Sequence, residues 1–186
     1  PSVLAETDAS GTITAYYVYG LGLISKIEGN TAYFYQYDGL GSTVALTNSS
    51  GAVLNKYAYD DFGNLATNST ETVANPFKYV GRFGVMADAA DLLYMRARYY
   101  MSTIGRFINK DPIGLVGGLN MYGYVGGNPI RFIDPMGLQA NGQCGLDEYT
   151  RRAKWWEWIV WGLMRFYYNL RMPLGYQGPD MGPVPP

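Results

Sequence analysis

The sequence predicts a mainly β protein, in which stacked β-hairpins form a curled or spiralling sheet, followed by an α-helical C-terminal tail. Three observations support this prediction. The 186 residues include 24 Gly and 18 Tyr but only 16% charged residues, a composition typical of short strands joined by tight turns. A hairpin-forming repeat occupies residues 1 to about 80, and the composition changes abruptly after Leu138.

The repeat predicts serial hairpins. One unit opens with Asp8-Ala9-Ser10-Gly11, a matching unit opens with Asn48-Ser49-Ser50-Gly51, and a Tyr-rich unit at 33–39 lies between them. The period is therefore about twenty residues, and each unit is a pair of strands. Gly adopts positive φ and Asx side chains bond to their own backbone, so each opening forms a tight turn. Because one hairpin cannot bury its face alone, we expect the units to stack into a continuous sheet.

The segment 92–100 extends the β pattern beyond the repeat. Arg96 and Arg98 alternate with Met95, Ala97 and Tyr99, which predicts a single strand with one polar face. A solvated side chain is the ordinary expectation for an arginine such as Arg96.

The tail, residues 139–186, has a different character. A helix is expected over about 146–171, with all four Trp of the chain between Trp155 and Trp161 and a basic stretch before them. The segment is too short and too charged for a membrane span. It is either a membrane-surface helix or an apolar helix buried against the β structure. The Pro- and Gly-rich end after Met172 is expected to be extended.

Composition excludes several kinds of site. The chain has no His, so a Ser-His-Asp triad and His-based metal sites are excluded. Cys144 is alone, which leaves neither a disulfide framework nor a CxxC metal pair. A net charge of −1 gives no footprint for nucleic acid, and we expect no cofactor and no metal. Pro1 opens the chain without a signal-peptide pattern, so we expect a processed product or the C-terminal piece of a longer protein.

Two matching units, 111–115 and 134–138, carry the candidate chemistry. Both read Asp-Pro-x-Gly-Leu, and a Gly-, Asn- and Tyr-rich stretch separates them. Either unit alone would be an ordinary turn. Two carboxylates held close together in an apolar setting cannot both ionise readily, so one can activate water while the other supplies a proton.

The motifs together resemble those of the RHS (rearrangement hot spot) YD-repeat proteins. The residues that carry the resemblance are 37–43, 59–64, Arg98-Tyr99-Tyr100, Gly105-Arg106-Phe107 and the paired Asp-Pro units. The resemblance implies YD-repeat hairpins over 1–78, an RHS-associated core domain over 79–138 and a variable tail over 139–186. It also implies that the sheet is part of a hollow shell, in a secreted or cell-surface bacterial protein.

The resemblance further implies self-cleavage just after the second Asp-Pro unit. By position, the cleaved bond is Leu138–Gln139, the carboxylates are Asp111 and Asp134, and Arg98 is the supporting arginine. The activity would be at most a single-turnover, aspartic-type autoproteolysis in cis. Two positions depart from the family pattern: Met101-Ser102 replaces the usual Asp-Pro after Arg-Tyr-Tyr, and Gly39 stands where His is frequent.

The sequence is compatible with two functions from different classes, and with a third that it favours less. The first is a self-cleaving shell segment that encloses and releases a C-terminal effector. The second is a structural protein whose open sheet edges assemble into a tube or filament, with the tail helix as connector. The partners are accordingly upstream repeats or copies of the chain, with possible membrane contact through the tail. The third is a carbohydrate-binding module that uses exposed Tyr.

Overall fold

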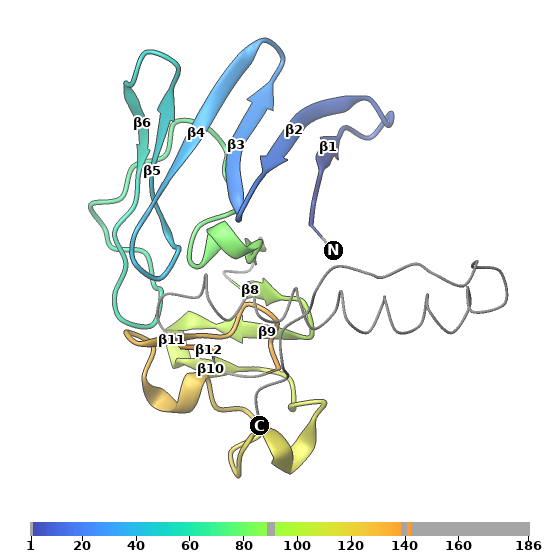
Figure 1. Ribbon diagram of the computed structural model, residues 1–186, viewed down its shortest axis with the longest axis vertical. Coiled ribbons are helices and arrows are strands. Elements are labelled where there is room, and N and C mark those ends of the chain that lie inside the picture. Colours follow the sequence, from blue (N-terminus) through green and yellow to red (C-terminus); the bar gives the residue numbers. More distant parts are fainter. Residues whose placement is uncertain (1, 89–91, 139–140, 143–186) are drawn as a thin grey trace, which may run out of the picture. The chain divides into compact units, whose positions relative to one another are not determined.

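A six-stranded antiparallel meander occupies residues 5–56, at the N-terminal end of the protein (Figure 1). The computed structural model describes residues 2–88, 92–138 and 141–142, all within one compact unit, Pro1–Leu146. The strands follow chain order: β1 Ala5–Thr7, β2 Ile13–Tyr19, β3 Leu23–Glu28, β4 Thr31–Tyr37, β5 Thr43–Asn48 and β6 Val53–Lys56. The predicted mainly β class and the serial hairpins are confirmed. The expected helix at 146–171, Gln139 and Cys144 lie outside the described residues.

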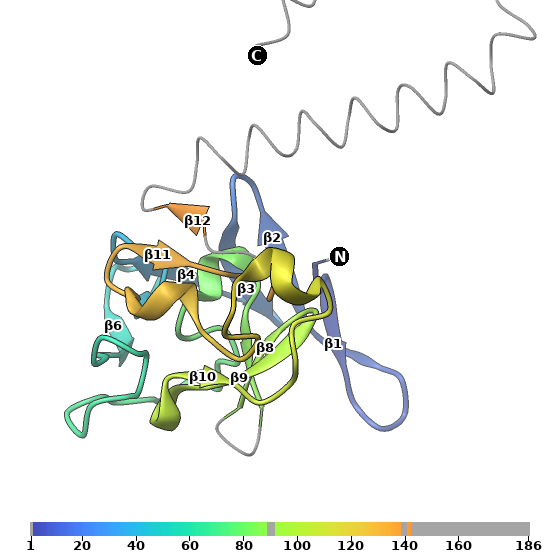
Figure 2. The same cartoon turned by 90° about the horizontal axis from the view of Figure 1, so that it is seen from below.

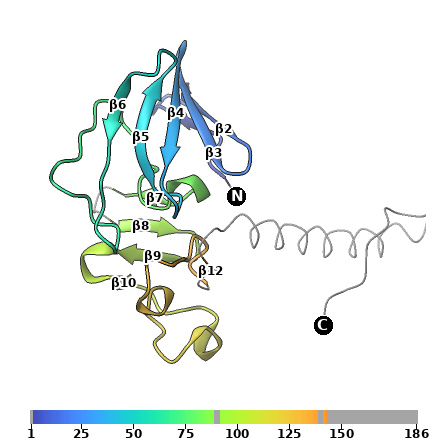
Figure 3. The same ribbon diagram turned by 60° about the vertical axis from the view of Figure 1, so that its left-hand side comes forward.

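A second antiparallel sheet follows in the order β10-β9-β8-β7 (Figure 3). Its strands are β7 Met86–Ala87, β8 Leu92–Met95, β9 Arg98–Met101 and β10 Arg106–Phe107. Near the end of the described chain, β11 Phe132–Ile133 pairs with β12 Asn141–Gly142, both orange in Figure 2. The helical elements of the described part are short 3-10 turns: η1 Gly81–Phe83, η2 Ser102–Ile104, η3 Gly114–Gly117 and η4 Val125–Gly127. No helix there is long and apolar enough to cross a membrane.

The segment 92–100 is a hairpin and not the single strand that the alternation predicted. Met95 of β8 pairs with Arg98 of β9, which leaves Arg96 and Ala97 as a two-residue turn. Arg96 has a φ of 55°, the left-handed conformation that such tight turns use. The alternation was misleading because this turn contains neither Gly nor Asn, the residues that usually mark one.

The predicted Asx turns are confirmed, and their hydrogen bonds share one pattern. In each, the side-chain oxygen of the Asx residue accepts hydrogen bonds from the backbone N–H groups two and four positions later. The residue three positions after the Asx residue is a Gly with positive φ. The Asx residues are Asp8, Asp38, Asn48 and Asp60. We call this the Asx-x-x-Gly turn.

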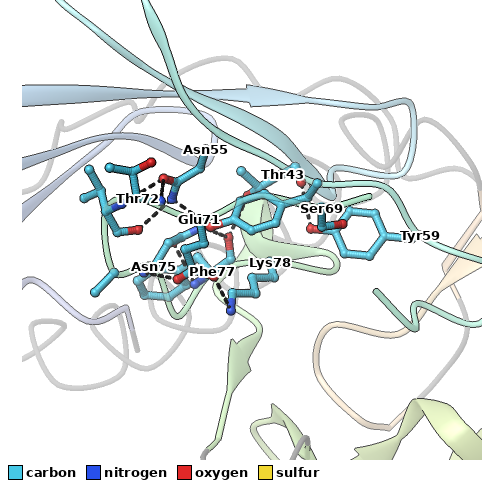
Figure 4. Close-up of polar contacts among 12 residues, drawn as sticks. Thr43, Asn55, Tyr59, Ser69, Glu71, Thr72, Asn75, Phe77 and Lys78 are labelled. Atoms are coloured by element: carbon cyan, nitrogen blue, oxygen red, sulfur yellow. Dashed lines mark hydrogen bonds and ion pairs between the residues drawn. The ribbon is translucent and has the colours of Figure 1, made fainter. Parts of the chain in front are cut away.

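Polar side chains fix the irregular segment that connects the two sheets (Figure 4). The fully buried Asn55 accepts the N–H groups of Thr72 and Val73 at 2.8 and 2.9 Å, and its amide donates to the Val73 carbonyl and the Tyr57 hydroxyl. Asn75, which is also buried, holds both backbone groups of Phe77 at 3.0 Å. These amides replace the backbone partners that a strand would supply.

Aromatic residues dominate two buried clusters. One lies under the first sheet and includes Tyr17, Tyr35, Leu46 and Phe77. The other lies around the second sheet and includes Tyr79, Val80, Val85, Leu93, Met95, Tyr100, Phe107 and Tyr124. The Tyr100 and Tyr124 rings lie 4.2 Å apart between centroids, and Phe107 packs edge-on against both. The second cluster therefore forms an apolar wall beside the candidate site described below.

Asn55→Ala should lower the free energy of unfolding by about 1–3 kcal/mol, because the hydrogen bonds that the buried Asn55 side chain makes to Thr72, Val73 and Tyr57 are lost. Urea denaturation checks this value. Asn30→Ala, at an exposed hairpin position, is the control and should change it by no more than about 0.5 kcal/mol. Equal effects of the two substitutions would contradict the assigned role of Asn55.

Alkaline unfolding should follow from the buried tyrosines. Burial raises the pKa of Tyr57 and Tyr79 to about 12, from an ordinary value of 10.0. Because only the neutral form is tolerated inside, their contribution to stability is complete below about pH 10 and is lost as the pH rises through about 12. Tyrosinate absorbance and circular dichroism should therefore change together in that window. Full ionisation of the tyrosines without unfolding would contradict this expectation.

Candidate active site

The structure brings Arg98, Asp111 and Asp134 together at one buried point. Arg98 Nη1 lies 3.0 Å from Asp111 Oδ2, and Arg98 Nη2 lies 3.2 Å from Asp134 Oδ2. All three residues are buried, with 3%, 7% and 2% of their surfaces exposed. Two carboxylates that are 23 positions apart in the sequence thus contact one guanidinium group.

Arg98 is fixed by three further contacts. It begins β9, and its guanidinium carbon lies 3.6 Å from the centroid of the Phe107 ring on the neighbouring β10. Nε donates to the Gly137 carbonyl at 2.6 Å, and Nη1 also donates to the Met121 carbonyl at 3.3 Å. The guanidinium plane is therefore held on its face by an aromatic ring and at its edge by four oxygen acceptors.

Asp134 forms an Asx-x-x-Gly turn of the same general type as the hairpin turns. The Gly137 N–H donates to the Asp134 carbonyl at 3.1 Å, and the Leu138 N–H donates to Oδ1 at 3.1 Å. In the hairpins, the Asp or Asn side chain binds groups of its own turn. Here, Oδ1 binds the backbone of Leu138 while Oδ2 contacts Arg98.

Asp111 divides its two oxygens in the same way. Oδ1 accepts the Ile113 N–H at 3.0 Å, while Oδ2 contacts Arg98. The Asp111 N–H in turn donates to the Met121 carbonyl at 2.9 Å, so Met121 is bound by both Asp111 and Arg98. Each Asp-Pro unit thus orients its own carboxylate through local backbone bonds, which is a preorganised arrangement.

Two glycines allow the backbone to approach this site. A Cβ on Gly137 would lie 2.5 Å from the Met95 carbonyl oxygen and 3.0 Å from the Arg98 backbone nitrogen. A Cβ on Gly117 would lie 2.7 Å from Asp111 Oδ2. Gly137 therefore lets the segment approach the β8–β9 hairpin closely, and Gly117 lets the loop approach the Asp111 carboxylate.

The electrostatics of the cluster favour its assembly as a unit. One guanidinium charge lies between two carboxylates and offsets their mutual repulsion. Removal of one member would leave a buried charge without its partner, which typically costs about 3–5 kcal/mol. Within the described residues, no group of three or more acidic or Cys side chains has a metal-binding arrangement.

Leu138, the first residue of the predicted Leu138–Gln139 cleavage bond, lies directly beside the cluster of Arg98, Asp111 and Asp134. Leu138 is half-buried and its N–H is bound by Asp134, and the preceding carbonyl, that of Gly137, is bound by Arg98. Gln139 lies outside the described residues. The predicted residues Arg98, Asp111, Asp134 and Leu138 therefore lie within one connected set of contacts.

The sequence did not predict that the β8–β9 turn contributes to this site. Arg96 Nη1 donates to the Pro135 carbonyl at 2.7 Å, and the Ala97 N–H donates to the Met136 carbonyl at 3.2 Å. Arg96 was expected to be solvated, but its side chain is half-buried and bonded. The position of Arg96 beside Pro135, 39 positions later, could be predicted only if the two-residue turn were recognised.

Gly137→Ala should lower the free energy of unfolding by about 2–4 kcal/mol, because overpacking and a left-handed φ both penalise the methyl group. Gly11→Ala is the matched control, since Gly11 also has positive φ but has no neighbouring atom within 4 Å of the position that a methyl group would occupy. That control should cost only about 1–2 kcal/mol. Similar losses for the two variants in urea denaturation would mean that the contact with β8–β9 is unimportant.

Comparison with known proteins relates the chain to bacterial toxin proteins. No protein-family model matches the chain. It is 37% identical over 144 residues to the tRNA3(Ser)-specific nuclease WapA of Bacillus spizizenii, covering 73% of this chain and 6% of that protein. It is 38% identical over 105 residues to double-stranded DNA deaminase toxin A of Burkholderia cenocepacia, covering 54% of this chain and 7% of that one.

Solved structures also relate the chain to bacterial toxin proteins. A crystal structure of TcdB2-TccC3-TEV matches 71% of this chain with a TM-score of 0.58 and 27% identity, and the match covers 7% of that chain. A Tc holotoxin pore from Photorhabdus luminescens matches 74% of this chain with a TM-score of 0.58 and 25% identity. The chain therefore spans less than a tenth of the length of these relatives. By sequence and by fold, it is a homologue of RHS-type bacterial toxin proteins, the family that its motifs resemble.

Proposed function

We propose that this chain is a segment of an RHS β-shell that encloses a C-terminal effector and releases it by cutting itself once, in cis, at Leu138–Gln139. In this proposal, residues 1–78 are YD-repeat hairpins, residues 79–138 are the RHS-associated core domain, and residues 139–186 are the released peptide. The protein is secreted or displayed on the surface of a bacterium, as befits a homologue of delivered toxins.

The shared contact of Asp111 and Asp134 with Arg98 carries the proposal. An aspartic-type hydrolysis needs two carboxylates beside one peptide bond. Here, the same arginine binds both carboxylates and the Gly137 carbonyl, and Asp134 also binds the Leu138 N–H. The proposed catalytic groups and the substrate segment therefore orient one another, which favours reaction at the adjacent bond.

The proposed reaction balances without a cofactor. One carboxylate accepts a proton from water as the water oxygen bonds to the carbonyl carbon of Leu138. The proton is then delivered to the nitrogen of Gln139 as the carbon–nitrogen bond breaks. Arg98 keeps the carboxylates in place and stabilises negative charge near the reacting carbonyl. The products are the carboxylic acid of Leu138 and the amine of Gln139, and the acid then gives its proton to the amine or to solvent. Each chain therefore reacts once.

The relatives support delivery as the shared function. Their names give different activities, a tRNA nuclease and a DNA deaminase toxin, although both are similar to this chain. A part common to such different toxins is better explained by enclosure and release than by the toxic reaction itself. The tail from Gln139 onward would then be the effector, with its Trp-rich stretch as a candidate membrane contact.

Assembly through sheet edges is the second candidate function. β1 lies at the edge of the six-stranded sheet, and within the described residues no strand pairs with its outer side, so this edge is where another strand could add. Upstream repeats or a second copy of the chain could supply it, and the tail would then connect subunits. Light scattering separates the two sources, because a stable monomer contradicts assembly from copies.

Asp111→Asn should block cleavage of the full chain. The amide can still accept the Ile113 N–H but lacks the charge for Arg98 and the basicity for water, so the rate should fall by about 10²–10⁴-fold. Intact mass gives the result: the wild type should yield residues 1–138 and 139–186. Asp61→Asn, at an exposed turn position, is the control and should cleave normally. A wild-type chain that stays at full length would overturn the proposed function.

A further inference from the structure

We propose that the turn of the β8–β9 hairpin is a template for the substrate segment, and that Arg96 is a positioning residue for cleavage. This inference rests on the proposed function, because it concerns how the chain presents its own Leu138–Gln139 bond. Arg96 lies outside the acid pair and contacts the segment at Pro135, three residues before Leu138.

Three consecutive residues, the two of the turn and the first of β9, bind three consecutive carbonyls of the segment. Arg96 Nη1 donates to the Pro135 carbonyl at 2.7 Å, the Ala97 N–H to the Met136 carbonyl at 3.2 Å, and Arg98 Nε to the Gly137 carbonyl at 2.6 Å. The two stretches therefore lie in a fixed one-to-one register. That register sets where the next carbonyl in sequence, that of Leu138, is presented.

Arg96 is itself anchored on the side away from the segment. Nη2 donates to the Phe83 carbonyl at the end of η1, at 2.7 Å. A Cβ on Gly84 would lie 3.0 Å from the same nitrogen, so the adjoining backbone fits closely around the guanidinium. The side chain thus bridges η1 and the cleavage segment, and its position is not set by the hairpin alone.

The backbone conformation of Arg96 indicates that its side chain is suited to the bridge between η1 and the cleavage segment, and not to the turn itself. Its φ of 55° is a conformation that Gly or Asn adopts more readily. An arginine is therefore a poor choice for the turn itself. Gly at this position should keep or improve the hairpin while it removes both hydrogen bonds of the guanidinium.

Arg96→Gly in the full chain separates the two roles. We expect the variant to fold, with an unchanged β-sheet circular dichroism spectrum, and to cleave about 10–100-fold more slowly than the wild type, because a small misplacement of a reacting group costs that much. Arg96→Asn, which also tolerates a left-handed backbone, should behave alike and replaces Arg96→Gly if that variant does not fold. Millimolar methylguanidinium should restore part of the rate to either variant.

Hydrogen exchange provides a reading that does not depend on cleavage. In the Asp111→Asn background, which keeps the chain intact, Arg96→Gly should speed exchange of the Gly137 and Leu138 amides, which close the Asp134 turn. The amides of Thr72 and Val73, held by Asn55, should not change.

The outcomes distinguish this inference from the proposed function. If the wild type cleaves and Arg96→Gly cleaves at the same rate, the positioning role is wrong while the proposed function stands. If the wild type does not cleave, the proposed function fails. In that case, unchanged exchange at Gly137 and Leu138 in Arg96→Gly would also overturn the template.

Discussion

The buried guanidinium of Arg98 is the interaction on which the rest of the site depends. It joins three stretches that are remote in sequence: strand β9, the loop at Asp111 and the turn at Asp134. None of these could bury its polar group alone without a large desolvation cost. Together with the Phe107 ring and the Gly137 and Met121 carbonyls, they satisfy one another inside an otherwise aromatic core.

The site also shows how a repeated structural turn can acquire a chemical role. At Asp8, Asp38, Asn48 and Asp60, the side-chain oxygen closes an exposed hairpin turn. At Asp134 a related turn is buried, and the second carboxylate oxygen meets an arginine. Burial and one cation thus separate a turn former from a candidate catalytic acid, although the local backbone bonds are similar.

Local signals account for what could be predicted from sequence. The Asx-x-x-Gly turns are encoded within five residues, so the meander followed directly from the repeat. The grouping of Arg98, Asp111 and Asp134 came from the resemblance and not from spacing. Features that depend on long-range contacts were not predictable: the Asn55 network holds a segment without periodicity, and Arg96 occupies a left-handed turn position that its residue type does not suggest.

The incorporation of heavy oxygen into the cleaved chain tests the central claim most directly. The claim is that two carboxylates organised by Arg98 direct water onto the carbonyl carbon of Leu138. When the chain is produced and matures in water labelled with oxygen-18, the fragment that ends at Leu138 should carry one labelled oxygen in its C-terminal carboxylate beyond the level reached by exchange. A fragment that ends elsewhere, or a Leu138 carboxylate without the label, would contradict the account.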